Sequence, residues 1–272
     1  MNELKNTSKE IRKSIIEMIF ESKSGHPGGS LSATDILTYL YFKEMNIDPK
    51  NPDMKDRDLF VLSKGHAAPA LYATLAERGY FDKELLVSLR KLNSPLQGHP
   101  DSKKLPGVDV STGSLGQGVS NAVGLALGAK MDQSNAKIYT LLGDGELQEG
   151  LVWEAFMVDA HYKLNNLVVI IDNNGLQIDG KNEDVLDIGS LKDKMEAFNF
   201  HVVEVDGHSF EALETAFNSI KEMKDAPICI VAKTVKGSGV SFMENEIGWH
   251  GAAPNAEQKM KALMELNVKE SV

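Results

Sequence analysis

The sequence predicts an α/β fold with an open parallel sheet that is covered by helices on both faces. Five short apolar runs have the length of buried strands, at residues 58–63, 136–142, 167–171, 200–205 and 228–232. Segments with helical spacing of apolar residues separate most of these runs. Strand and helix therefore alternate, which is typical of a parallel sheet, because each parallel strand needs a crossover before the next one.

The helices follow from apolar spacing and from capping signals. Residues 4–22 place a row of apolar side chains on one helical face. Glycine and proline break this pattern at residues 25–29, and we expect Ser30 or Ser32 to cap a second helix that continues to about Met45. Further helices are expected after residue 66 and at residues 115–130, 146–162, 191–198 and 209–223.

The composition is that of a globular protein and argues against two classes of partner. Of the 272 residues, 42% are hydrophobic and 25% are charged, so we expect one large domain over residues 1–272. A formal net charge of −10 argues against nucleic acid and against an anionic membrane, since both are bound by basic surfaces. The apolar runs are also too short to span a bilayer.

Two features indicate a cytoplasmic location. Residues 1–10 are polar and charged, without the apolar stretch of a secretory signal. Cys229 is the one cysteine of the sequence, so no disulfide framework can form within the chain. We therefore expect the protein to work in a reducing compartment.

Four glycine-bearing segments each follow a predicted strand, at residues 64–66, 143–145, 173–175 and 236–239. In open parallel sheets, ligands bind outside the carboxyl ends of the strands. We therefore expect these four loops to converge on one ligand-binding edge of the sheet.

Asp144 is the first candidate for a metal ligand. It lies between Gly143 and Gly145 directly after a strand, where the backbone can approach a ligand closely. Asn174 would add an amide oxygen and Leu176 a carbonyl oxygen, a set suited to Mg²⁺, or to Ca²⁺ or Mn²⁺ in its place. Alone, each segment would be interpreted as a turn. Their placement after two strands, with one helix and one strand between them, favours a binding site.

These segments resemble those of a known family. Gly-Asp-Gly followed about thirty residues later by Asn-Asn resembles the signature of thiamine diphosphate enzymes, and the flanking residues 143–150 and 171–180 resemble the transketolase version. The resemblance extends from about residue 10 to residue 254, in family order and spacing. It implies the diphosphate-binding domain of the thiamine diphosphate-binding fold. Further segments that resemble transketolase are residues 24–28, 63–67, 98–100, 111–118 and 249–251.

The glycines of residues 111–118 do not form a nucleotide-binding motif. Their order is Gly-x-x-Gly-x-Gly, which is the reverse of the dinucleotide fingerprint, and no clear strand ends directly before them. The sequence also contains no P-loop. The transketolase resemblance instead implies that Gly113, Ser114 and Leu115 bind the cofactor, with Gly113 and Leu115 against the thiamine.

Four histidines, His26, His66, His99 and His250, lie beside a glycine. Such histidines are commonly structural, and no pair has the spacing of a zinc helix. The resemblance places all four at active-site positions. It implies that His66 and His250 contact the diphosphate and the substrate channel, and that His26 and His99 contact donor and acceptor oxygens. Surface or packing roles are expected for the remaining histidines, His161, His201 and His208.

Three charged residues are open to two interpretations. Lys64 and Lys233 are interpreted as solvated surface lysines, with contact to phosphate or to a closing loop as the alternative. Glu149 follows the Gly-Asp-Gly loop and would ordinarily be a solvated carboxylate. The resemblance implies that it lies at the cofactor site and meets the opposite subunit near that subunit's catalytic glutamate.

The resemblance covers the first of the three transketolase domains, so we expect the pyrimidine-binding and C-terminal domains to be absent from this chain. It implies the N-terminal subunit of a split transketolase, active only with a C-terminal subunit that supplies the pyrimidine domain. We expect a heterotetramer with two copies of each chain. The missing domain would carry the glutamate that activates the cofactor and the arginines that hold the substrate phosphate.

The implied activity is transfer of a two-carbon glycolaldehyde unit from a ketose phosphate to an aldose phosphate, as in the pentose phosphate pathway. Two alternatives remain open. One is a split enzyme with the same cofactor that acts on another sugar phosphate, such as a branched one. The other is a non-catalytic cofactor-binding module. Glu146 and Ile178 occupy variable family positions, and residues 239–248 form a shorter segment than in long transketolases, so His250 is expected to serve there.

Overall fold

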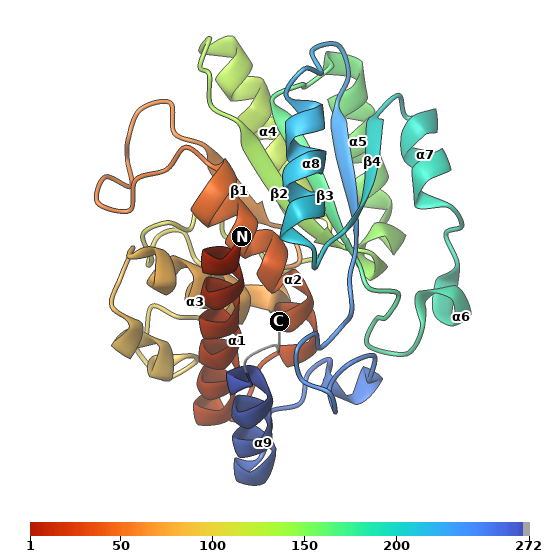
Figure 1. The fold of residues 1–272 in the computed structure, drawn as a ribbon. Helices are drawn as coiled ribbons and strands as arrows, with labels where there is room; N and C mark the ends of the chain where they lie inside the picture. The colour runs from red at the N-terminus through yellow and green to blue at the C-terminus, as the bar shows by residue number, and fades with distance from the viewer. Residues whose placement is uncertain (269–272) are drawn as a thin grey trace.

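The central sheet has five parallel strands in the order β1-β2-β3-β5-β4 (Figure 1). The computed structural model describes residues 1–268 of the chain. The predicted open parallel sheet is confirmed. Its strands are β1 (Leu59–Leu62), β2 (Ile138–Gly143), β3 (Leu167–Asn173), β4 (His201–Asp206) and β5 (Ile228–Lys233).

Helices pack on both faces of this sheet, as predicted (Figure 1). Short turns of other helix types are η1 (Leu40–Glu44), η2 (Gly65–Ala67), η3 (Lys83–Ser88), η4 (Gly145–Gln148) and η5 (Ile247–Trp249). The α-helices are α1 (Asn2–Ser22), α2 (Pro27–Tyr39), α3 (Ala68–Arg78), α4 (Gln117–Met131), α5 (Gly150–Tyr162), α6 (Asn182–Leu186), α7 (Leu191–Ala197), α8 (Phe210–Ile220) and α9 (Ala256–Asn267).

Strand β3 shows why the predicted strands are continuous apolar runs and do not alternate apolar with polar residues. Val168 and Ile170 point into one core, which contains residues of α1, α2, α3 and α8. Leu167, Val169 and Ile171 point into a second core on the other face, with residues of α4 and α5. Both faces of the strand are therefore buried, as expected for a parallel sheet between two helical layers.

The predicted cap of the second helix is wrong. Helix α2 begins at Pro27, with His26 at the N-cap position. Proline suits the first helical turn, because its φ is already helical and its missing N–H would have no partner there. The Ser30 hydroxyl donates back to the His26 carbonyl (2.7 Å), while the Ser32 hydroxyl donates to Asp172 (2.6 Å).

The single helix predicted over residues 146–162 is also wrong, because Glu149 has an extended backbone (φ −77°, ψ 124°) and separates η4 from α5. The sequence patterns did not predict two of the α-helices, α6 and α9. Helix α6 has five residues, too few for a periodic pattern. Helix α9 begins with a capping box formed by Asn255 and Gln258 and packs against α1.

No helix within residues 1–268 combines the length and the apolar character that a membrane crossing requires. The longest, α1, carries charged residues throughout and buries one face against α2 and α3. This agrees with the short apolar runs of the sequence.

A carboxyl group is buried on α5 without a hydrogen-bond partner among the described residues. Asp159 has no exposed surface, and neither of its side-chain oxygens accepts a hydrogen bond there. Burial raises the pKa of Asp159 to about 8, although the charge of Lys130 acts in the opposite direction. The folded protein therefore binds a proton at this residue that the unfolded chain releases at a much lower pH.

We expect Asp159→Asn to remove this pH dependence. The contribution of Asp159 to stability is fully present below the unfolded pKa near 3.8 and is lost as the pH rises through about 8. Across this range the unmodified protein should lose up to about 1.4 kcal/mol of unfolding free energy per pH unit relative to the variant. Chemical denaturation at pH 5, 7 and 9 measures the difference. Parallel pH curves would contradict it, and Asp184→Asn on exposed α6 is the control.

Candidate active site

The loops after β1, β2, β3 and β5 converge at the carboxyl ends of the strands, as the sequence predicts. They enclose a cleft of about 330 Å³. Most of the predicted cofactor, metal and catalytic residues line this cleft, whereas the predicted cofactor residue Ser114 and the predicted catalytic residues His26 and His99 do not. The predicted residues in the lining are His66, Gly113, Leu115, Gly143, Asp144, Gly145, Glu149, Asn174, Leu176 and His250.

Asp144 is buried at the base of the cleft, with 4% of its surface exposed. Its two carboxylate oxygens accept backbone hydrogen bonds, one from Gly145 (2.8 Å) and one from Gly175. Burial raises the pKa of Asp144, and the Gly175 hydrogen bond partly opposes this shift. The carboxylate is therefore held rigidly between the loops after β2 and β3.

The other two predicted metal ligands lie in the same cleft. The Asn174 side-chain oxygen accepts the backbone N–H of Leu176 (3.2 Å), and the Leu176 carbonyl accepts a hydrogen bond from the Lys236 ammonium (3.0 Å). One carboxylate, one amide and one carbonyl oxygen form the hard donor set that Mg²⁺ and Ca²⁺ take. The residues present therefore fit a divalent cation.

This oxygen set differs from an ordinary metal cluster. Among residues 1–268 there is no group of three or more His, Cys, Asp or Glu side chains arranged to hold a metal ion. A site with one carboxylate leaves positions open for phosphate oxygens and water, as Mg²⁺ sites commonly do.

Three imidazole rings lie close together at the cleft, and two of them, His66 and His250, belong to its lining. The ring centroids of His26, His66 and His250 lie 5.4–5.5 Å apart. Burial and neighbouring positive charges lower the pKa of His26 to about 4 and that of His250 to about 3, and burial holds the pKa of His66 well below its usual value. All three rings are therefore neutral at pH 7, and each can donate one hydrogen bond and accept another.

His99 lies beside this group, next to Gly113. A Cβ atom added to Gly113 would come within 3.2 Å of the His99 ring, so glycine permits this close approach. Burial and then the charge of Arg90 lower the pKa of His99. The Arg90 charge also contributes to the low pKa of His26. No sequence signal pointed to Arg90, because an arginine in a polar loop is unremarkable.

The interpretation of Lys64 as a solvated lysine is wrong. Its exposed fraction is 2%, and its ammonium binds the fully buried carboxylate of Asp172 and the Gly29 carbonyl (3.0 Å). Although burial raises the pKa of Asp172, the Lys64 charge holds it below its usual value. Lys233, in contrast, is exposed at the end of β5.

Lys236 is a site residue that the sequence reasoning missed. It is 2% exposed, and its ammonium contacts both the Leu176 carbonyl and Nδ1 of His250 (2.9 Å). Burial, followed by the charge of Lys64, lowers its pKa to about 8. The available signal was its position in a glycine-bearing segment directly after a strand.

Glu146 is a second missed residue, since the sequence placed it at a variable position. Its buried side chain accepts hydrogen bonds from the Ser63 hydroxyl (2.5 Å), the Gly116 N–H (2.8 Å) and the Gly143 N–H (3.1 Å). Burial raises its pKa, and these donors lower it in part. One carboxyl group thus joins three loops around the cleft.

The open side of the cleft carries exposed residues. Glu149 and Ser114 are exposed, and Ile178 shows 62% of its surface. Glu149 still borders the cleft, whereas Ser114 lies outside its lining. The rest of the described chain therefore leaves this side of the site largely uncovered.

Comparison with known proteins decides the family. A family model described as "Transketolase, thiamine diphosphate binding domain" matches residues 4–270. The chain belongs to the transketolase family. The resemblance drawn from residues 143–150 and 171–180 is thereby confirmed, and the match supports thiamine diphosphate as the cofactor of this transketolase domain.

Two transketolase relatives of similar length are named as subunits. An apulose-4-phosphate transketolase subunit of Phocaeicola vulgatus is 43% identical over 260 residues, which are 96% of this chain and 92% of the relative. The 6-deoxy-6-sulfo-D-fructose transketolase subunit SqwG of a Clostridium species is 42% identical over 264 residues, 97% and 96% of the two chains. Human transketolase is 44% identical over 254 residues, but these cover 39% of its length.

Solved transketolases share the fold. The structure of transketolase from Campylobacter jejuni matches all of this chain with a TM-score of 0.93 and 35% identity. The match covers 44% of that protein. The chain therefore has the transketolase fold of the thiamine diphosphate-binding domain and spans less than half of the solved transketolase.

The Lys64–Asp172 ion pair yields a stability prediction. Lys64→Met leaves a fully buried carboxylate without its cation, and removing one partner of a buried pair destabilises a protein by roughly 3–5 kcal/mol. Lys181→Met, which breaks the exposed pair with Glu183, should change stability by less than about 1 kcal/mol. Urea denaturation of the full chain measures both. Equal losses in the two variants would contradict this assignment.

Proposed function

We propose that this chain is the diphosphate- and metal-binding subunit of a two-chain transketolase. The observation that carries the proposal is the meeting of the Asp144, Asn174 and Leu176 oxygens in one cleft with neutral imidazoles and a buried lysine. This arrangement suits a divalent cation together with an anionic, phosphate-bearing ligand. It is supported by the family match and by relatives that are named as subunits.

The metal end of the cofactor would be held by the oxygens described above. Mg²⁺, or Ca²⁺ or Mn²⁺, would take the Asp144 carboxylate, the Asn174 amide oxygen and the Leu176 carbonyl. His66, His250 and Lys236 would donate to the diphosphate. Gly143 and Gly145 let the backbone approach it closely.

The thiamine end would lie against Gly113, Ser114 and Leu115. Bound thiamine diphosphate supplies the nucleophilic carbon and the electron sink for breaking the carbon–carbon bond beside a ketose carbonyl. His26 and His99 would hold the donor and acceptor oxygens near the reacting carbons. The His26 Nδ1 atom is buried without a partner in the described residues, so it is available to bind such an oxygen.

A partner chain would complete the site. We propose that residues 1–272 form one diphosphate-binding domain and that a C-terminal subunit brings the pyrimidine-binding domain, in a heterotetramer with two copies of each chain. Glu149, exposed at the edge of the cleft, would meet this partner. We place the assembly in the reducing cytoplasm, in keeping with the single buried Cys229.

The proposed reaction is transfer of a two-carbon unit from a ketose phosphate to an aldose phosphate. A second candidate is the same transfer on another sugar. It is favoured by the names of the relatives, which refer to apulose 4-phosphate and to 6-deoxy-6-sulfo-D-fructose. Screening donors with both chains present separates the two candidates. The donor with the highest kcat/KM identifies the substrate class.

Asp144→Ala should abolish metal-dependent binding of thiamine diphosphate. The variant removes the one carboxylate of the oxygen set, so the cation would lose its charged ligand. Calorimetric titration of the two-chain enzyme with thiamine diphosphate, with and without Mg²⁺, measures the affinity. Asp184→Ala, on exposed α6, serves as the control. Unchanged affinity in the Asp144 variant would exclude this role.

The chain alone should bind cofactor weakly and show no transketolase activity. Mixing it with the C-terminal subunit should give a particle with two copies of each chain and restore turnover, because each site would need both chains. Native mass spectrometry and a coupled activity assay test this. A fully active assembly of this chain alone would refute the proposal.

A further inference from the structure

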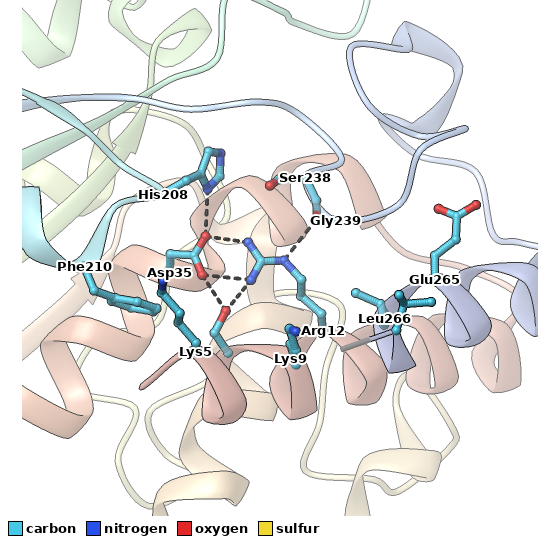
Figure 2. Close-up of a pocket in the computed structure, with 12 residues that line it drawn as sticks. Lys5, Lys9, Arg12, Asp35, His208, Phe210, Ser238, Gly239, Glu265 and Leu266 are labelled. Atoms are coloured by element: carbon cyan, nitrogen blue, oxygen red, sulfur yellow. Dashed lines mark hydrogen bonds and ion pairs between the residues drawn. The ribbon is translucent and has the colours of Figure 1, made fainter. Parts of the chain in front are cut away.

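A buried carboxylate outside the cofactor cleft gathers two basic side chains (Figure 2). Asp35 of α2 binds the Arg12 guanidinium of α1 through two hydrogen bonds of 2.8 and 2.6 Å. His208, which follows β4, contacts the same carboxylate through Nδ1 at 2.7 Å. The side chains of Asp35 and Arg12 are 8% and 7% exposed. We call these three residues the Asp35 clamp.

Both basic residues of the Asp35 clamp also form hydrogen bonds with the backbone of the loop after β5. Nε2 of His208 accepts the backbone N–H of Val235 (2.9 Å), and Nε of Arg12 donates to the Ser238 carbonyl (3.0 Å). These two points of the loop lie on either side of Lys236. The Asp35 clamp therefore grips the backbone just before and shortly after the lysine whose ammonium lies in the cofactor cleft.

The hydrogen bonds determine the tautomer of His208. A backbone N–H can only donate, so Nε2 is the acceptor and Nδ1 carries the hydrogen that is donated to Asp35. The imidazole is thereby oriented by a carboxylate on one side, in the same way that carboxylates orient histidines that bind metals. The loop also turns sharply at Gly237 (φ 83°), where an added Cβ would lie 2.2 Å from the Met243 carbonyl oxygen.

We propose that the Asp35 clamp is a positioning device that fixes the Val235–Gly239 loop and so holds Lys236 in the cofactor cleft. The inference rests on the proposed function, because the contact of Lys236 with diphosphate is part of it. Arg12, Asp35 and His208 are positioning residues, since they lie outside the lining of the cleft. A buried ion pair often contributes little net stability. The measurements that test the clamp therefore follow the position of Lys236 and not the stability of the fold.

The chain offers a matched control for Asp35→Asn. Asp109 is buried to a similar degree (6% side-chain exposure) and also binds an arginine, Arg57, at 2.6 Å. It accepts the Phe60 N–H at β1 and has no contact with the Lys236 loop among its hydrogen bonds. Asp109→Asn therefore makes the same chemical change to a buried aspartate that pairs with a partly buried arginine elsewhere.

The first measurement is the rate at which an amine-acetylating reagent modifies Lys236 in the full chain, followed by peptide mass spectrometry. Lys236 is nearly inaccessible in the unmodified protein. Releasing the loop should raise its modification rate at least about fivefold in Asp35→Asn, as local opening increases. The rate should stay unchanged in Asp109→Asn. Equal rates in both variants would overturn the proposal.

The second measurement is thiamine diphosphate affinity in the two-chain enzyme. Asp35→Asn should raise the dissociation constant about tenfold more than Asp109→Asn, with a smaller effect on kcat at saturating cofactor. An equal loss of thiamine diphosphate affinity in both variants would overturn the positioning role, because it would show that the Asp35 clamp only stabilises the fold. If the unmodified enzyme binds no thiamine diphosphate, the proposed function fails, while the modification rates still decide the clamp.

His208 provides the test if Asp35→Asn does not fold. His208→Gln keeps a group that can donate to Asp35 and accept from Val235, whereas His208→Ala removes both contacts. Lys236 should be modified faster in His208→Ala and should be largely protected again in His208→Gln. The same rate in both variants would overturn the proposal.

Discussion

The buried ion pair between Lys64 and Asp172 is the interaction on which the cleft depends. Lys64 follows β1 and Asp172 lies near the end of β3, so the pair spans the carboxyl end of β2 between them. The same carboxylate accepts hydrogen bonds from Ser32 of α2 and from Thr234 after β5. Four segments that are distant in sequence are thus fixed around one charge, because an unpaired charge at this depth would be strongly unfavourable.

Two further buried carboxylates also hold together segments that are distant in sequence. Glu146 joins the loops after β1 and β2 to the start of α4, and Asp35 joins α1 and α2 to the loop that carries Lys236. Each carboxylate is satisfied by several donors, so each loop has few alternative arrangements. The loops that carry the groups proposed to meet the cofactor are therefore held by hydrogen bonds before it binds, which would lower the ordering entropy lost on binding.

The sequence predicted the sheet, the convergence of its loops and the cleft residues that follow strands. These follow from short-range patterns: apolar runs, helical spacing and glycine after a strand. It assigned Lys64 to solvent and passed over Lys236, because side-chain identity does not reveal burial. It also missed the break at Glu149, and it did not reveal that Glu146, three residues earlier, turns inward to the Ser63 hydroxyl and to the N–H groups of Gly116 and Gly143.

By itself, then, the sequence determined the fold class, the family and the position of Asp144 and Asn174 at the ends of two strands. Those properties reside in local pattern and in motif spacing. The tertiary structure alone decided which charges are buried together, namely Lys64 with Asp172 and Arg12 with Asp35. The physical reason is that pairing of this kind joins residues far apart in the chain, where only the packed fold determines distance, desolvation and hydrogen-bond geometry.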